Sequence, residues 1–231
     1  AEKAEPSDSV LTYLANKIRH GDKLTPYSMV TGASSNLASP IAKDLQDDQI
    51  IISQWLADDL EAGVGDKISL DYYVVETGRK LVVESADFTV HSIGQIGAHG
   101  WDHTWTPEFP GIFEVDDLDD WEPGIPIDRS LIRDKDEDYW DDHRATPKAF
   151  ITLAAAQKLF ANRFGNTTSI RFVGEKTEAY RSELKNNLTL GDIGLSIRNV
   201  SEEARKAVGQ SFDFGALFAS MSFFLIVAAL V

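Results

Sequence analysis

The spacing of apolar residues predicts two kinds of regular structure in the first part of the chain. A helical spacing near the N-terminus would end at Gly21, and it is carried by Val10, Leu11, Leu14 and Ile18. Strict alternation follows over residues 67–75, where every second side chain is apolar. We therefore expect an N-terminal helix and, after several turns, a strand with one buried face.

Shorter apolar runs between turn residues predict the remaining elements. We expect strands over residues 26–30, 49–53, 81–90, 149–151, 169–173 and 195–200. We expect helices over residues 54–60 and 178–187, and a third that Thr152 caps and that ends near Gly165. A polar stretch with a glycine joins 67–75 to 81–90, so these two strands are expected to form a hairpin. Two strand–helix–strand units and a hairpin define an α+β fold.

The last stretch of the chain, residues 214–231, carries no charge. A helix that crosses a bilayer needs about 20 predominantly apolar residues, and only Ser220 and Ser222 interrupt this run. A soluble helix of similar length normally shows a polar stripe toward water. We therefore expect residues 211–231 to be the start of a transmembrane helix whose far end is cut off. The alternative is a buried C-terminal helix of a large globular core.

Composition and charge restrict the function classes. The chain has 231 residues and no cysteine, which allows a sizeable core and excludes disulfides and thiolate chemistry. Its net charge of −15 argues against a surface that binds nucleic-acid phosphates. Lysine and arginine favour the cytoplasmic side of membrane helices, so an acidic domain beside such a helix is expected outside the cytoplasm. No GxxxxGK[ST] phosphate loop occurs, so the chain is not itself an ATPase.

Residues 95–145 combine acidity with large aromatic side chains. Between Glu114 and Asp142 there are thirteen acidic residues and three basic ones, which gives this segment a net charge of −10. Prolines and glycines punctuate it and favour loops. Its aromatic residues distinguish it from a disordered acidic tail; they are Trp101, Trp105, Trp121, Tyr139 and Trp140. We predict an ordered, loop-rich acidic insertion in which the last three of these pack against the domain body.

The acidic insertion also holds the candidate metal ligands. Asp134, Asp136 and Asp138 have the spacing with which a calcium loop begins, but the glycine and the final glutamate of such a loop are missing. We expect instead that most acids face solvent and that a few pair with arginines of the insertion, namely Arg129, Arg133 and Arg144. No catalytic, cofactor-binding or metal-binding residue is assigned, and no cofactor is expected.

Several runs in the chain resemble a known family. The runs IIISQWLADDLEAGVGDKISLDYYVV (residues 50–75) and FTVHSIG (88–94) resemble the MacB-like periplasmic core of FtsX-like ABC transporter permeases. In that family an alanine-bearing helix, a turn ending in Gly-Asp, a strand pair and a strand of the form FxVxGI follow in this order, and residues 92–94 depart slightly from the last motif.

Other runs extend the resemblance over residues 26–231. FPGI (109–112), PID (126–128) and RDKDEDYWDDHRATPKAF (133–150) are similar to a subgroup of long bacterial permeases. The final run, DFGALFASMSFFLIVAALV, resembles the start of the second membrane helix in that family.

The resemblance implies a division of the chain and a role. Residues 1–94 and 146–210 would form the extracytoplasmic α+β core, 95–145 the acidic insertion, and 211–231 a truncated transmembrane helix. The implied role is not enzymatic: the domain lies on the periplasmic side of the inner membrane and passes ATP-driven movement of membrane helices to a substrate or partner. The implied partners are an ABC ATPase subunit or domain, another permease copy or subunit, and the membrane.

Two other hypotheses remain open. The first is a membrane-anchored binding or adhesion module whose acidic insertion holds calcium or carbohydrate. The second, which is weaker, is a hydrolase that uses paired carboxylates of the insertion; clustered acids usually form a solvated face, and such an enzyme needs two in defined opposing positions.

Overall fold

The computed structural model describes residues 7–34, 40–76, 80–116, 118–122, 124–163, 165–172, 177–192, 194–210 and 214–230. These belong to two compact units, Ala1–Glu175 and Lys176–Val231. Both helices and strands are present, so the α+β fold class is confirmed.

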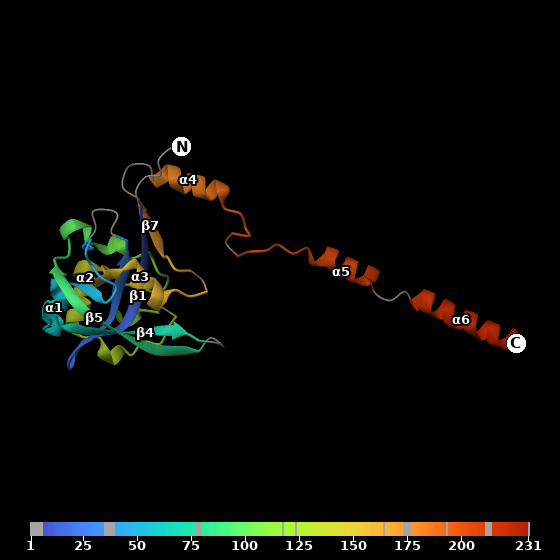
Figure 1. The fold of residues 1–231 in the computed structure, drawn as a ribbon, viewed down its shortest axis with the longest axis horizontal. Coiled ribbons are helices and arrows are strands. Elements are labelled where there is room, and N and C mark those ends of the chain that lie inside the picture. Colours follow the sequence, from blue (N-terminus) through green and yellow to red (C-terminus); the bar gives the residue numbers. More distant parts are fainter. Residues whose placement is uncertain are drawn as a thin grey trace. The chain divides into compact units, whose positions relative to one another are not determined.

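Six strands of the first unit close into a barrel (Figure 1). In chain order they are β1 (Ser7–His20), β2 (Lys23–Ala33), β3 (Gln49–Ser53), β4 (Lys67–Val75), β5 (Leu81–Gly94) and β6 (Ala149–Thr152). Around the barrel the order is β1, β2, β6, β3, β5, β4 and back to β1. The pairs β2–β6 and β3–β5 are parallel, and the other four are antiparallel. A seventh strand, β7 (Ser169–Phe172), pairs only with the beginning of β1 among the described strands.

The alternation of side chains along the strands separates the barrel core from the outer wall. In β3, Ile50 and Ile52 lie in a cluster to which all six barrel strands contribute. Ile51, between them, packs outside against Trp101 and Trp105 of the acidic insertion. The helices α1 (Gln54–Leu60) and α3 (Leu153–Phe160) add further side chains to the inner cluster. Both faces of β3 are therefore covered by apolar side chains.

Each of these two helices starts where a parallel-paired strand ends. Ser53 closes β3, and its hydroxyl accepts a hydrogen bond from the backbone N–H of Leu56 at 3.1 Å. Thr152 closes β6, and its hydroxyl accepts from the N–H of Ala155 at 3.1 Å. These are N-cap bonds, which satisfy donors that the first helical turn leaves free. The strand–helix junctions are thus set locally by the sequence, and the predicted cap at Thr152 is confirmed.

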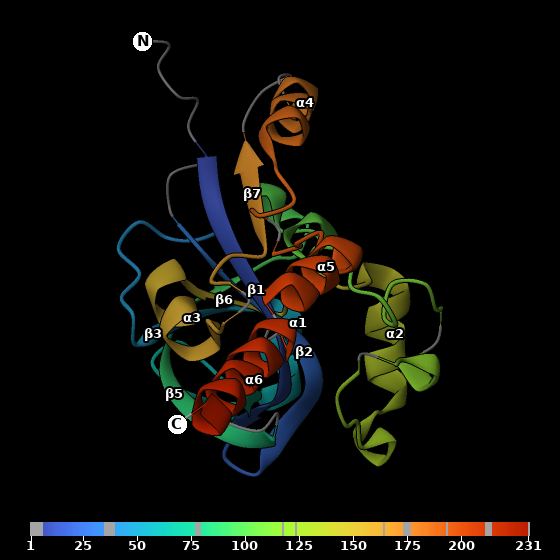
Figure 2. The same cartoon turned by 90° about the vertical axis from the view of Figure 1, so that its right-hand side faces the viewer.

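The acidic insertion packs on the outer wall of the barrel. It contains the short 3-10 helices η2 (Ala98–Gly100), η3 (His103–Trp105), η4 (Leu118–Asp120) and η5 (Arg129–Leu131), and the helix α2 (Asp134–His143). Figure 2 shows α2 on the flank of the body away from α3. The predicted packing of the aromatics is confirmed, because Trp121, Tyr139 and Trp140 are each no more than 5% exposed.

The helix predicted for residues 10–18 is wrong, because this segment forms β1. The cause is burial on both faces: Leu11 and Ala15 lie in the barrel core, whereas Val10 packs outside beside Trp101. A strand that is covered on both sides loses the alternation of polar and apolar residues. Its apolar positions then fell at a spacing that imitates a helix.

The other predicted elements of the first unit are confirmed, with shifted ends in some cases. Strands β3 and β4 and helix α1 have the predicted bounds, and the hairpin of β4 and β5 is antiparallel with Val75 opposite Leu81. Residues 77–79 of its turn lie outside the described ranges. Helix α3 ends at Phe160 rather than near Gly165. Strand β7 ends at Phe172, and the predicted last residue, Val173, is not described.

The second unit consists of three helices, α4 (Thr177–Asn187), α5 (Val200–Gln210) and α6 (Phe214–Leu230). The strand predicted over residues 195–200 is wrong. Among the described strands none pairs with this segment, and its apolar side chains Leu195 and Ile197 are 57% and 85% exposed rather than buried on one face. Helix α6 forms in the uncharged run as predicted. Within the described ranges, none of the helices combines the length and the apolar character that crossing a membrane requires.

Gly32 of β2 provides a test of how closely α3 packs on the barrel. A methyl group at this position would collide with Cβ of Ala156 and lie 3.1 Å from the carbonyl oxygen of Thr152. We expect Gly32→Ala to lower the free energy of unfolding, measured in urea, by roughly 1–3 kcal/mol. Gly63→Ala is the control, because its methyl would meet only Asp66 Oδ2 at 3.6 Å. Equal stability of the two variants would contradict this packing.

Candidate functional site

Arg133, at the start of α2, joins the acidic insertion to the body of the domain. Its guanidinium donates to both carboxylate oxygens of Asp59 in α1, at 3.2 and 2.8 Å. It also donates to both carboxylate oxygens of Asp136, at 2.7 and 2.8 Å, and to the carbonyl oxygen of Leu24 in β2 at 3.1 Å. The side chains of Asp59 and Asp136 are only 2% and 4% exposed. One cation therefore bridges α1, α2 and β2.

The carboxylate of Asp59 receives further donors. Lys135 forms an ion pair with it, and the hydroxyl of Thr25 donates to Oδ2 at 2.5 Å. Burial acts to raise the pKa of Asp59, but the hydrogen bonds from Arg133, Lys135 and Thr25 outweigh it and hold that pKa below its ordinary value. Asp59 is therefore ionised at neutral pH, and this negative charge anchors the start of α2.

Lys148, just before β6, is a second buried cation. Its Nζ lies 3.7 Å from Oδ1 of Asp136, 4.1 Å from the ring centre of Trp55 and 4.4 Å from that of Tyr139. Burial lowers the pKa of Lys148 to about 8, and the neighbouring carboxylates of Asp136 and Asp59 only partly oppose this. The ammonium thus sits in an aromatic box with one long ion pair.

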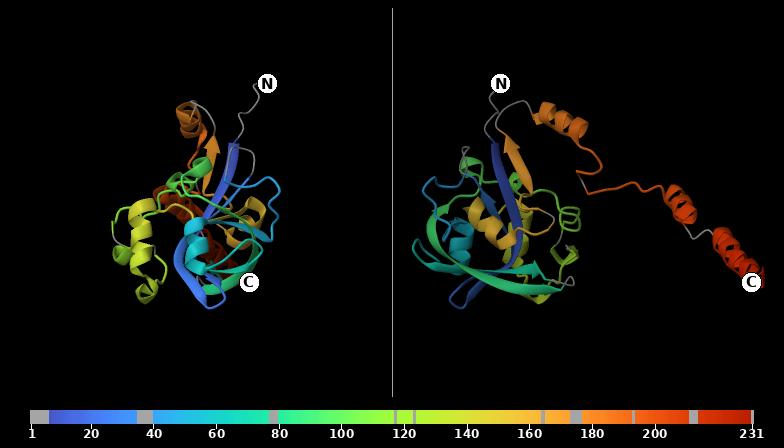
Figure 3. Two further views of the ribbon diagram at one scale, coloured as in Figure 1. Left: turned by 90° about the vertical axis from the view of Figure 1, so that its left-hand side faces the viewer. Right: turned by 45° about the vertical axis from the view of Figure 1, so that its right-hand side comes forward.

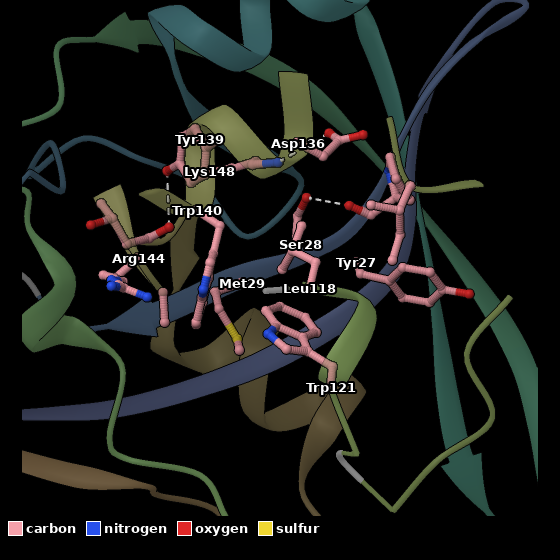
Figure 4. A pocket seen from close by; sticks show the side chains of 14 residues that line it. Tyr27, Ser28, Met29, Leu118, Trp121, Asp136, Tyr139, Trp140, Arg144 and Lys148 are labelled. Carbon is pink, nitrogen blue, oxygen red and sulfur yellow. Dashed lines mark hydrogen bonds and ion pairs between the residues drawn. The ribbon is translucent and has the colours of Figure 1, made fainter. Parts of the chain in front are cut away.

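A pocket lies between β2 and α2 beside these charges (Figure 4). In the close-up, Asp136, Tyr139 and Lys148 gather at one end and Trp121 lies at the other. The free space is about 30 Å³, enough for one or two waters. Its walls combine apolar side chains with both ends of the ion pair between Asp136 and Lys148.

The calcium pattern does not assemble into a metal site. Asp134, Asp136 and Asp138 lie in the first half of α2, where residues two apart project toward different sides of a helix. Asp136 is already engaged by Arg133 and Lys148. Across the described ranges, no group of three or more histidine, aspartate or glutamate side chains lies close enough to hold a metal ion.

The pairing predicted for the arginines of the insertion is confirmed in part. Arg144 Nη2 lies 3.1 Å from Asp116 in an exposed pair. Arg129 donates to the carbonyl oxygen of Trp121 at 3.2 Å. Most acids of the insertion whose burial is described are exposed as expected, and among these Asp136 is buried.

Sequence reasoning missed the two residues that complete the site. The partner of Arg133, Asp59, is 74 positions away in the chain, and no local pattern connects them. Lys148 follows a proline and precedes a short apolar strand, where a lysine normally faces water. The only available signal was that Asp59 and Lys148 both lie in segments that carry the family resemblance.

The chain was compared with known proteins. Neither a scan against models of protein families nor a search of curated proteins gives a match. The function must therefore be argued from the residues and their arrangement.

Lys148 makes the stability of the domain depend on pH in an unusual direction. Its pKa in the fold, about 8, lies below the ordinary value of 10.5, so the unfolded chain binds more protons between these pH values. Stability must then rise with pH through this window. We expect the free energy of unfolding to increase by about 1–2 kcal/mol from roughly pH 8 to 9.5, and Lys148→Met to remove the rise.

The control for this measurement is Lys158→Met, which changes an exposed lysine on α3 and should keep the rise. Urea unfolding followed by circular dichroism at each pH gives the free energies. A wild-type stability that is flat or falls over this window would show that the ammonium of Lys148 is not penalised by burial.

Proposed function

We propose that this chain is the extracytoplasmic domain of an FtsX-like ABC transporter permease. In this role it transmits ATP-driven movement of membrane helices to a substrate or partner outside the cytoplasm. ATP is hydrolysed on a separate subunit or domain, and this chain contributes no catalytic residue. Its partners are that ATPase, a second permease copy or subunit, and the inner membrane of a bacterium, with the domain on the periplasmic side.

The pairing of β1 with β7 carries the proposal. Ser7 lies opposite Phe172, and Val10 lies opposite Ser169, in an antiparallel pair. Both views in Figure 3 show β7 alongside β1. Partners in such a pair are about 5 Å apart, so the first residues of β1 and the last residues of β7 lie side by side. A domain carried between two membrane segments needs this arrangement, because relative movement of the segments then reaches the body through one strand pair.

The arrangement of the family-like segments supports the proposal. Residues 50–75 and 88–94 fold as β3, α1, β4 and the last part of β5, which are contiguous in the barrel wall. The third family-like segment, residues 133–150, contacts them directly, because Arg133 binds Asp59 of α1. These three runs of the first unit therefore form one continuous structure rather than scattered motifs.

The surface of α6 supports the membrane part of the proposal. The helix has no charged residue, and its large apolar side chains are exposed within the structure. They are Leu217, Phe218, Met221, Phe223, Phe224, Leu225, Ile226, Val227 and Leu230. Contiguous exposed apolar surface of this kind marks a membrane or protein contact. We place α6 in contact with the lipid bilayer.

Flotation with lipid vesicles tests this role. We expect the chain to float with the vesicles, and a variant that lacks residues 214–230 to stay in the dense fraction while its first unit still unfolds cooperatively. Leu225→Lys should weaken vesicle binding roughly 100-fold, because a lysine within an apolar membrane helix costs about 3 kcal/mol. Ser220→Ala, which removes one hydroxyl from the same helix, should bind as the wild type does.

Two results would contradict the proposal. If deletion of residues 214–230 abolished cooperative unfolding, α6 would belong to a globular core instead of a membrane. If calorimetric titration of the purified chain with ATP gave a saturable heat, the separation of this domain from the ATPase would be wrong.

A further inference from the structure

Two hydrogen-bond donors in the pocket between β2 and α2 have no acceptor. They are the indole N–H groups of Trp121 and Trp140, whose side chains are 4% and 3% exposed. Within the described part of the chain, neither nitrogen has a hydrogen-bond partner. An unsatisfied buried donor costs about 1–3 kcal/mol, and tryptophan N–H groups usually find a partner when buried. Two such donors in one pocket can be satisfied by a ligand that supplies acceptors.

The two indoles are held next to each other on the wall of the pocket. Their ring centres are 4.9 Å apart at an angle of 79°, and both pack with Met29 of β2. Figure 4 shows the nitrogen-bearing edge of Trp121 turned toward the side chain of Met29. Methionine has three rotatable side-chain bonds and can turn aside, so the pocket can open to a small group without movement of the barrel.

The other polar groups of the pocket are already paired. Ser28 donates to the carbonyl oxygen of Pro26 at 2.9 Å, and the hydroxyl of Tyr139 donates to the carbonyl oxygen of Thr146 at 3.0 Å. Asp136 is bound by Arg133. The polar oxygens named here each take part in at least one hydrogen bond, whereas the two indole N–H groups take part in none with the described residues. A ligand that supplies acceptors would satisfy both indoles.

Charge favours an anion. Two basic side chains, Arg144 and Lys148, line the pocket against one acidic side chain, Asp136, so its wall is positive in a chain of net charge −15. The guanidinium of Arg144 lies 5.7 Å from the ring centre of Trp140. Its present partner, Asp116, is 97% exposed, and an exposed pair of this kind is weak and easily exchanged. Arg144 is therefore available to a second anion.

We propose that this pocket binds a carboxylate group. The indole N–H groups of Trp121 and Trp140 donate to its oxygens, and Arg144 supplies the countercharge. The space of about 30 Å³ holds one or two waters, so Met29 must turn aside to admit the ligand, and a planar group of three heavy atoms needs less added room than a tetrahedral phosphate. The ligand class is a small carboxylic acid or the carboxylate end of a larger molecule. The inference is independent of the proposed transporter role, because it rests on this pocket alone.

Nuclear magnetic resonance of the indole N–H groups tests the proposal. The full chain, labelled with ¹⁵N and held in a mild detergent, has five tryptophans, and Trp121→Phe and Trp140→Phe assign the two signals of interest. Sodium acetate is titrated at constant ionic strength against sodium chloride, with acetamide as the uncharged analogue. We expect the signals of Trp121 and Trp140 to move downfield along one saturable curve with acetate only.

The same spectra contain internal controls. Trp101 already donates to the carbonyl oxygen of Pro147 at 2.7 Å, and Trp105 donates to that of Gly100 at 2.6 Å, so their signals should stay in place. Arg144→Met should weaken the apparent affinity for acetate about tenfold or more, because a bond to a charged group is lost. Arg181→Met, at an exposed position in α4, should leave the affinity unchanged.

Several results would overturn the proposal. If acetate moved the two signals no more than chloride does, the donors would be satisfied by water only. If all five indole signals moved together, acetate would be acting on the whole protein and not at a site. If acetamide matched acetate, the pocket would not select a carboxylate. A second titration separates the two ligand sources: a short peptide with a free C-terminal carboxylate binds only if the pocket accepts the end of a longer molecule.

Discussion

The acidic insertion depends on one constraint, which is that two buried carboxylates share a single guanidinium. Removing Asp59 and Asp136 from water is costly, and a cation with donors for both offsets much of that cost, while Lys135 and Lys148 each pair with one of the two carboxylates. Arg133 meets this requirement with four hydrogen bonds of 2.7–3.2 Å. Its own backbone N–H also donates to Asp136 at 3.0 Å, which caps the start of α2. Fixing this end of α2 also fixes the positions of Tyr139 and Trp140, which lie one to two turns later. These two side chains form part of the wall of the pocket.

The same arginine connects the insertion to the strands that carry the proposed function. It donates to the carbonyl oxygen of Leu24 in β2. Strand β2 pairs with β1 from Val10 opposite Ala33 to His20 opposite Lys23, and β7 pairs with the beginning of β1. A continuous chain of hydrogen bonds thus leads from the β1–β7 pair through β2 to α2. This is the physical route that the proposed transmission of movement requires, and the carboxylate pocket lies at its end.

Local signals in the sequence were sufficient for much of the fold. The bounds of β3 and α1 were predicted from short apolar runs between turn residues, and those of β4 from alternation over residues 67–75. The sequence could not reveal that β1 is a strand, because burial on both faces removed its alternation, nor that the sheet closes, because closure depends on pairs that are distant in the chain. For the same reason the ion pair of Arg133 with Asp59 was not predictable, whereas the burial of Trp121, Tyr139 and Trp140 was, since so much aromatic surface is costly to leave in water.

A double-mutant cycle between Asp59 and Arg133 tests the central constraint most directly. The free energies of unfolding of Asp59→Asn, Arg133→Met and the double variant are compared with that of the wild type. If the guanidinium offsets the buried charge of Asp59, each single change leaves an uncompensated group, and the coupling energy is roughly 2–3 kcal/mol. The exposed pair of Lys23 and Glu61, treated in the same way, should give a coupling energy within the error of the measurement. Additivity of the Asp59 and Arg133 changes within about 0.5 kcal/mol would contradict the account.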